Sequence, residues 1–149
     1  MLAGRAVKAV TLAPAATAAA VSPAASNTAA PVASVALAVK AAPGIPHMLV
    51  PDGAEAEWVS EAGEVKEASL WSPALATAVR RATVIGRGGL ATLTDEDDPG
   101  AGTGPVGDLL YEPDGAVIRA GLVTAVAAGV DGHLLDPRIA YVSSDAAYR

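Results

Sequence analysis

Four basic side chains are the residues whose types and positions could do chemistry, because the chain offers few other reactive groups. Lys40 lies in an apolar stretch, where a buried ammonium needs a partner, and Arg80 and Arg81 are the only adjacent basic pair. Together with Arg119, they could contact a substrate or the phosphates of an RNA. Two structural alternatives remain open. Lys40 could extend into water from the end of a strand, and Arg80 and Arg81 could interact favourably with the dipole at the end of a helix.

Other polar residues favour structural roles. Asp114 suits the N-cap of a helix better than it suits an acid catalyst. Glu112 precedes Arg119 and could form an ion pair with it. His47 lies beside a turn and His133 in a glycine-containing loop, and neither has carboxylates arranged as a triad or as metal ligands.

Two loops resemble ligand-binding motifs without satisfying them. The run Gly86-Arg87-Gly88-Gly89 lacks the spacing of a nucleotide-binding loop, and no helix is predicted after it. The run Asp95-Glu96-Asp97-Asp98 lacks the spaced ligands and central glycine of a calcium loop. With no Cys and only two His, thiolate and multi-histidine metal sites are excluded as well. We therefore expect no metal.

Charge is unevenly distributed along the 149 residues. Residues 1–51 contain three basic residues and no acidic one, which gives this part a net charge of +3. The remainder contains seven basic and 16 acidic residues, a net charge of −9, so the whole chain carries −6. This shift indicates a boundary near residue 50. The acidic part does not resemble a phosphate-binding surface, which gathers cations on one face.

The apolar inventory predicts a small core. Much of the 52% hydrophobic content is alanine, and the chain has no Phe, two Trp and three Tyr. Aromatic rings usually supply the large pieces of buried area, and small domains bury a modest share of their surface. The composition indicates a chain that is incomplete or that depends on a partner.

The N-terminal segment reads as an Ala/Pro-rich leader. Residues 9–39 carry no charge, but Pro14, Pro23 and Pro31 interrupt them, which argues against a membrane span. Arg5 and Lys8 before a short apolar stretch leave a signal peptide open. We expect a disordered leader over residues 1–34 and a cytoplasmic protein without a membrane segment.

The remaining elements follow from periodicity and turn residues. The patterns predict a doubly buried strand at 35–42, a hairpin at 57–71, a helix at 74–81 and a strand at 82–85. A long loop at 86–108 precedes a helix from Asp114 to Gly129, with Ile118, Leu122, Ala125 and Val126 on one stripe. A turn at 134–137 and a strand at 139–143 follow.

One segment resembles the signature of a known family. It reads Tyr111-Glu112-Pro113-Asp114-Gly115-Ala116-Val117-Ile118-Arg119-Ala120-Gly121. The run is similar to a pattern in the THUMP-like domain that ends some bacterial class I S-adenosylmethionine (SAM)-dependent methyltransferases: Tyr-Glu-Pro, Asn or Asp, small residues, Lys or Arg, then Ala-Gly. Residues 139–145 resemble the strand after that domain's helix. Upstream, residues 39–44 resemble a late methyltransferase strand and 54–71 the hairpin that ends its sheet.

The resemblance implies methyl transfer from SAM for the full-length family, with RNA as the substrate class by analogy. The family binds SAM with a glycine-rich loop after its first strand and an acidic residue for the ribose. An Asp-Pro-Ala-Arg-like motif lies near the chemistry. None of these motifs occurs in this sequence. SAM is thus implied for the family, and no cofactor is expected for this chain alone.

These inferences define the expected fold and function. We expect an α+β fold with a leader at 1–34, a remnant of a methyltransferase sheet at 35–73 and a THUMP-like module at 74–149. The expected function is a C-terminal methyltransferase fragment, inactive alone, with RNA or the missing methyltransferase domain as partner. The alternatives are a non-catalytic RNA- or protein-interaction module and, from residues 1–30 only, a secreted alanine-rich protein.

Overall fold

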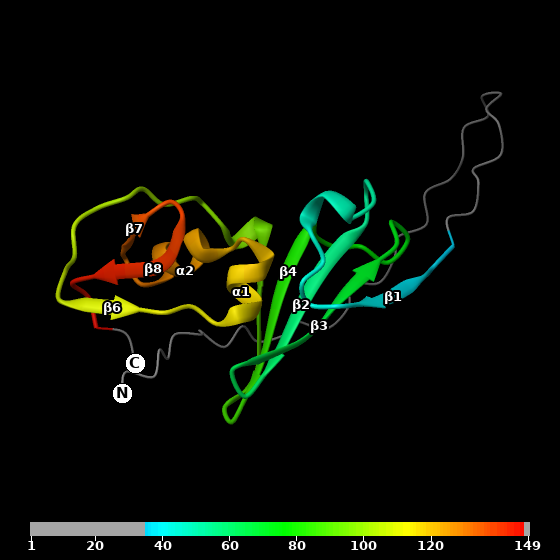
Figure 1. Cartoon of the computed structure of the whole chain (residues 1–149), viewed down its shortest axis with the longest axis horizontal. Helices are drawn as coiled ribbons and strands as arrows, with labels where there is room; N and C mark the ends of the chain where they lie inside the picture. The colour runs from blue at the N-terminus through cyan, green and yellow to red at the C-terminus, as the bar shows by residue number, and fades with distance from the viewer. Residues whose placement is uncertain (1–34, 148–149) are drawn as a thin grey trace, which may run out of the picture.

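The computed structural model describes residues 35–147, which form two sheets with two short helices between them (Figure 1). The larger sheet has the strand order β1-β3-β2-β4-β5 and the smaller one the order β6-β8-β7. This mixture confirms the predicted α+β class. The predicted leader at 1–34 lies outside the described residues.

The hairpin of the larger sheet forms as predicted. Strands β2 (Glu55–Glu61) and β3 (Glu64–Trp71) pair antiparallel across a two-residue turn. Its residues, Ala62 and Gly63, have φ values of 52° and 83°. Positive φ at both central positions is typical of the turn whose twist matches that of a hairpin.

Strand β1 (Ala38–Ala41) is an edge strand, so the prediction of a strand buried on both faces is wrong. It pairs antiparallel with β3 and has no second neighbour among the described residues. Its residues are exposed except for the half-buried Ala41. An apolar run alone cannot tell a central strand from an edge strand. The 3₁₀ turn η1 (His47–Leu49) follows β1.

The predicted helix at 74–81 is wrong, because these residues form turns and then enter strand β4 (Arg80–Gly86). The carboxylate of Glu55 accepts hydrogen bonds from the backbone N–H groups of Thr77 and Ala78. These bonds fix the turn in place of a helical ladder. Strand β4 pairs parallel with β2.

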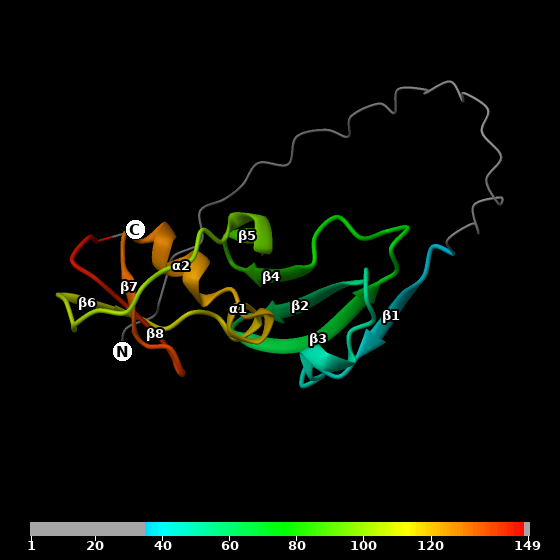
Figure 2. The same ribbon diagram turned by 90° about the horizontal axis from the view of Figure 1, so that it is seen from above.

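The predicted loop at 86–108 contains strand β5 (Gly89–Thr94) and the 3₁₀ turn η2 (Asp95–Asp97). Strand β5 pairs antiparallel with β4 and ends the larger sheet at the margin opposite β1 (Figure 2). The larger sheet therefore extends past residue 73, where the sequence predicts a second domain to begin. That domain boundary stays a prediction.

The single helix predicted from Asp114 to Gly129 is two helices, α1 (Gly115–Ala120) and α2 (Val123–Gly129). Asp114 is the N-cap as predicted, and its carboxylate accepts from the backbone N–H of Ala116 at 2.8 Å. The break lies at Gly121, whose φ of 69° is left-handed. Of the predicted apolar stripe, Leu122 and Ala125 are buried, whereas Ile118 is 39% exposed.

The smaller sheet contains β6 (Leu109–Tyr111), β7 (His133–Asp136) and β8 (Ile139–Ser144). Strand β8 confirms the predicted closing strand. The turn predicted at 134–137 instead begins after β7, because Leu134 pairs with Val142 in the ladder.

Two clusters form the core. In the larger cluster, α1 packs on β2 and β4, where alanines of the sheet face alanines of the helix around Trp58. Trp58 is 1% exposed and is the largest fully buried side chain. Small residues let the helix approach the sheet closely, and partly buried side chains such as Ile45, Leu70 and Val126 complete the packing. The smaller cluster contains Tyr111, Ala127, Val130 and Val142.

Candidate functional site

The four cations predicted to contact a substrate lie in two separate places. Lys40 and Arg81 lie on the face of the larger sheet that carries no helix, whereas Arg80 and Arg119 meet at the C-terminal end of α1. Lys40 pairs with Glu67 at 2.5 Å and remains 73% exposed. The Lys40 ammonium holds the pKa of Glu67 below its ordinary value. The four residues do not form one binding site.

Arg81 is held by a buried carboxylate. Its Nε donates to Oε1 of Glu55 at 2.5 Å, and Nη2 donates to the Thr77 hydroxyl at 2.7 Å. Glu55 is only 2% exposed. Burial raises its pKa, but the bonds from Arg81 and from the backbone of Thr77 and Ala78 outweigh burial, so the pKa lies below the ordinary value. The pair anchors the beginning of β4.

Arg80 closes the C-terminal end of α1. Its Nη1 donates to the carbonyl oxygens of Ala120 and Gly121, at 3.0 and 3.2 Å. A cation is stabilising at this end of a helix, because the last carbonyl oxygens have no partners within the helix and carry partial negative charge. A Cβ at Gly121 would lie 2.8 Å from Arg80 Nη1. The sequence predicted a helix-end role for the arginine pair, but the helix is α1, forty residues further along the chain.

His47 completes the same helix end, a role that the sequence did not reveal. Its ring stacks on Trp58 with centroids 4.8 Å apart, and Nε2 lies 2.6 Å from the carbonyl oxygen of Arg119. The carbonyl oxygen of Pro43 accepts from Trp58 Nε1 and Arg119 Nη1. Arg119 thus bonds to Pro43, and it does not form the ion pair with Glu112 that the sequence allowed. We name His47, Trp58, Arg80 and Arg119 the helix-end cluster.

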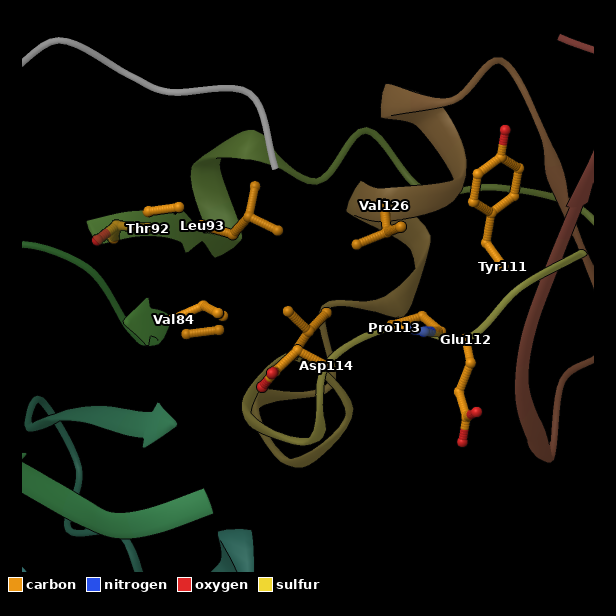
Figure 3. Close-up of a pocket in the computed structure, with 11 residues that line it drawn as sticks. Val84, Thr92, Leu93, Tyr111, Glu112, Pro113, Asp114 and Val126 are labelled. Carbon is orange, nitrogen blue, oxygen red and sulfur yellow. The ribbon is translucent and has the colours of Figure 1, made fainter. Parts of the chain in front are cut away.

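The family-like segment lines a narrow crevice between β4–β5 and the helices (Figure 3). The crevice encloses about 100 Å³, with walls that are largely apolar. Figure 3 shows the carboxylate of Glu112 directed away from Val84, Leu93 and Val126. Tyr111 donates to the carbonyl oxygen of Ala146 at 2.9 Å, and Asp114 caps α1. Tyr111 and Asp114 of the segment thus hold the chain itself in place.

A wider hollow of about 550 Å³ lies on the helix-free face of the sheet. Glu57 lines it, with one carboxylate oxygen accepting from Thr83 at 2.6 Å and the other from Trp71 Nε1 at 3.0 Å. The other walls carry Arg81, Leu90, Thr92, Thr94 and Asp97. Sequence reasoning missed Glu57, because its partners come from two other strands.

Neither hollow in residues 35–147 has the features that the family's SAM site requires. The crevice is smaller than the roughly 300 Å³ at which ligand pockets begin. The wider hollow has no glycine among its lining residues, whereas a glycine-rich loop would bring backbone N–H groups close to the cofactor. The glycine run at 86–89 is a hairpin turn between β4 and β5 and leads into no helix.

The outer edge of β1 has no neighbouring strand among residues 35–147. Val35, Leu37 and Val39 are 75%, 54% and 45% exposed. The carbonyl oxygen of Leu37 accepts from the backbone N–H of Ser72 in the neighbouring chain segment. Because backbone groups alternate in direction along a strand, those of Ala38 point away from the sheet. Within residues 35–147, the edge thus offers backbone groups without a strand partner beside apolar side chains.

Residues 35–147 contain no cluster of three or more His, Asp or Glu side chains able to hold a metal ion. Over the same part of the chain, no helix has the length and apolar character needed to span a membrane.

Comparisons with known proteins relate the chain to methyltransferases. No protein-family profile matches it. Two Mycobacterium tuberculosis proteins, from strains CDC 1551 / Oshkosh and ATCC 25618 / H37Rv, are each 42% identical to it over 113 residues. Both are named uncharacterized S-adenosylmethionine-dependent methyltransferases. The match covers 72% of this chain and 31% of each relative, so the chain spans about a third of their length.

A solved structure gives a consistent likeness in fold. A candidate methyltransferase from Porphyromonas gingivalis W83 superposes with a TM-score of 0.56 and 21% identity. The match covers 76% of this chain and 32% of that one. At this identity the likeness concerns the fold alone.

Proposed function

We propose that this chain serves as the C-terminal part of a SAM-dependent methyltransferase, where it completes the sheet of the enzyme and does not itself bind SAM. The observation that carries the proposal is its 42% identity, over 113 residues, to two proteins named as such enzymes. The relatives are about three times as long as the matched part, since it covers 31% of each. The cofactor site then belongs to the remainder of the enzyme.

The edge of β1 supports a docking role toward that remainder. An uncovered strand edge can pair with another strand, and proteins usually guard such edges with charge, proline or a covering segment. The β1 edge offers the backbone groups of Ala38, and Val35, Leu37 and Val39 expose apolar surface beside it. A strand added there would extend the larger sheet, and a helix following it would cover those apolar side chains.

The absence of a fitting cofactor site supports the second half of the proposal. The crevice is too small for SAM, and the hollow beside Glu57 is lined by residues of strands and of η2, with no glycine among them. In this proposal, Tyr111 to Gly121 belongs to the THUMP-like part. Asp114 caps α1 of that part, and the helix-end cluster holds the other end of α1 against the sheet.

RNA as the substrate class receives little support from this chain's own residues. Arg80, Arg81 and Arg119 are engaged in bonds to Gly121, Glu55 and Pro43, and Lys40 pairs with Glu67. Phosphate binding needs cations gathered on one face. RNA contact by this chain stays a prediction, and any nucleic acid would meet mainly the remainder of the enzyme.

Calorimetric titration with SAM tests the proposal. The purified chain alone should give no saturable heat, whereas the chain co-expressed with the other two-thirds of a Mycobacterium tuberculosis relative should co-purify with it and bind SAM as a complex. Micromolar affinity for SAM in the chain alone would contradict the proposal. Failure to co-purify would contradict the docking role.

A further inference from the structure

A second strand edge, at the opposite margin of the larger sheet, has no part in the proposed function. Strand β5 has β4 as its single neighbour in the described structure (Figure 2). Its residues, Gly89 to Thr94, include no charge and no proline. Leu90 is 54% exposed. The edge therefore lacks the usual features that prevent strand pairing.

The direction of the free backbone groups follows from the ladder. The carbonyl oxygens of Val79 and Ile85 accept hydrogen bonds from the N–H groups of Ala56 and Ala62. Odd-numbered residues at and beside β4 thus direct their backbone groups toward β2. Even-numbered residues of β4 therefore face β5, where Val84 is opposite Ala91. Alternation along β5 then directs the N–H and C=O groups of Leu90 and Thr92 outward.

The N–H of Thr94 already has a partner. It donates to the carboxylate of Asp97 at 2.8 Å, as part of the capping box of η2. A strand that joins β5 without disturbing this cap must therefore use the groups of Leu90 and Thr92. These residues flank Ala91, so the available groups are symmetric about it.

We infer that two copies of this chain associate through β5, with their β5 strands antiparallel about a two-fold axis at Ala91. In this register Leu90 of one copy is opposite Thr92 of the other, and all of their outward backbone groups gain partners. Antiparallel pairing of identical strands is an isologous contact, which closes after two copies. The two larger sheets become one continuous sheet.

Charge complementarity identifies a second copy as the occupant. Arg87 lies in the turn before β5 and Glu96 in η2 after it, so the two-fold axis brings the Arg87 turn of each copy toward η2 of the other. Asp95 of η2 already accepts from the N–H groups of Val79 and Arg80, which leaves Glu96 as the acidic partner for Arg87. Within residues 35–147, the side chains of Arg87 and Glu96 make no ion pair or hydrogen bond. An interface that pairs opposite charges at both ends favours this register over shifted ones.

The side chains at the axis are compatible with close approach. Ala91 would face its own copy at a pair without backbone hydrogen bonds, where Cα atoms lie about 4.5 Å apart. A methyl group fits this spacing. Leu90, now exposed, would pack against Thr92 of the second copy on the helix-free face.

Disulfide trapping tests the register directly, because the chain contains no Cys. The Ala91→Cys variant places two thiols opposite each other at a Cα separation within the disulfide range of about 4.4–6.8 Å. Mild oxidation should give a covalent dimer on a non-reducing gel. Leu93→Cys is the matched control, on the same strand and face, since its partner is Gly89 rather than itself. Equal trapping of both variants, or none of Ala91→Cys, would overturn the inference.

Sedimentation velocity over a concentration series tests the association itself. The unmodified chain should show a reversible dimer. Thr92→Pro removes an outward N–H, which an edge strand tolerates, and should give a monomer with unchanged circular dichroism. Arg87→Glu should weaken the dimer by about tenfold or more, and adding Glu96→Arg should restore it. A chain monomeric at all concentrations, or a dimer lost with Ala38→Pro but kept with Thr92→Pro, would refute pairing through β5.

Discussion

Removing the carboxylate of Glu55 should destabilise the protein strongly, because this group anchors the beginning of β4. Glu55 is 2% exposed and accepts from Arg81 Nε at 2.5 Å and from the N–H groups of Thr77 and Ala78 at 2.7 and 3.0 Å. Breaking a buried ion pair by deleting one partner costs about 3–5 kcal/mol. Arg81 keeps 22% of its side-chain surface exposed and can recover some hydration. We therefore expect Glu55→Ala to lower the free energy of unfolding by about 3 kcal/mol.

Urea unfolding followed by tryptophan fluorescence measures this change. A double-mutant cycle with Arg81→Ala should give a coupling energy of about 1–3 kcal/mol, because the two side chains are in contact. Lys40→Met is the matched control, since its ion pair with Glu67 lies on the surface, and it should leave the urea midpoint unchanged. A loss below about 0.5 kcal/mol for Glu55→Ala would refute the anchoring role.

The pH dependence of the same variants has a defined sign. The pKa of Glu55 is lower in the folded state than its ordinary value of 4.5. Its stabilisation is therefore complete above pH 4.5 and is lost as the pH falls through the folded-state pKa. The stability difference between the unmodified protein and Glu55→Gln should shrink over that interval. A constant difference down to pH 2 would contradict the pKa shift.

Three further substitutions test individual packing and capping contacts by urea unfolding. Gly121→Ala should cost about 1–3 kcal/mol, because the residue is left-handed and its Cβ would contact Arg80; a neutral effect would contradict this helix-end geometry. Asp114→Ala should cost about 1 kcal/mol while Asp114→Asn changes little, and equal losses would argue against capping. Trp58→Ala should cost about 3–5 kcal/mol, far more than a change at the half-buried Trp71; similar losses at both would contradict the assignment of Trp58 to the core.

Local sequence signals located the elements whose partners are near in the chain. The hairpin turn at Ala62-Gly63, the cap at Asp114 and the strand from Ile139 each depend on residues a few positions away. Turn and capping chemistry of this kind can be read from one sequence. The small, alanine-rich core expected from composition is also present, with Trp58 as its main large side chain.

Elements that depend on distant partners were not predictable. The turn before β4 requires Glu55, more than twenty residues earlier, and β5 was hidden in a glycine-rich, acidic stretch that resembles a loop. The helix-end cluster brings His47 to Arg119 across 72 positions, so no local pattern could indicate it. In the sequence, all four cations were candidates for contact with a substrate. Only their partners in the structure separate anchors such as Arg81 from the exposed Lys40.

Docking of the β1 edge onto the remainder of a methyltransferase is the central claim, and co-purification with edge-blocking variants tests it most directly. Each variant is co-expressed with the tagged other two-thirds of a Mycobacterium tuberculosis relative, and the amount that co-purifies is measured. Ala38→Pro removes an outward N–H of β1 and should abolish co-purification, whereas Thr92→Pro, the same change at the β5 edge, should leave it intact. Equal co-purification of both variants with the unmodified chain would contradict docking through β1.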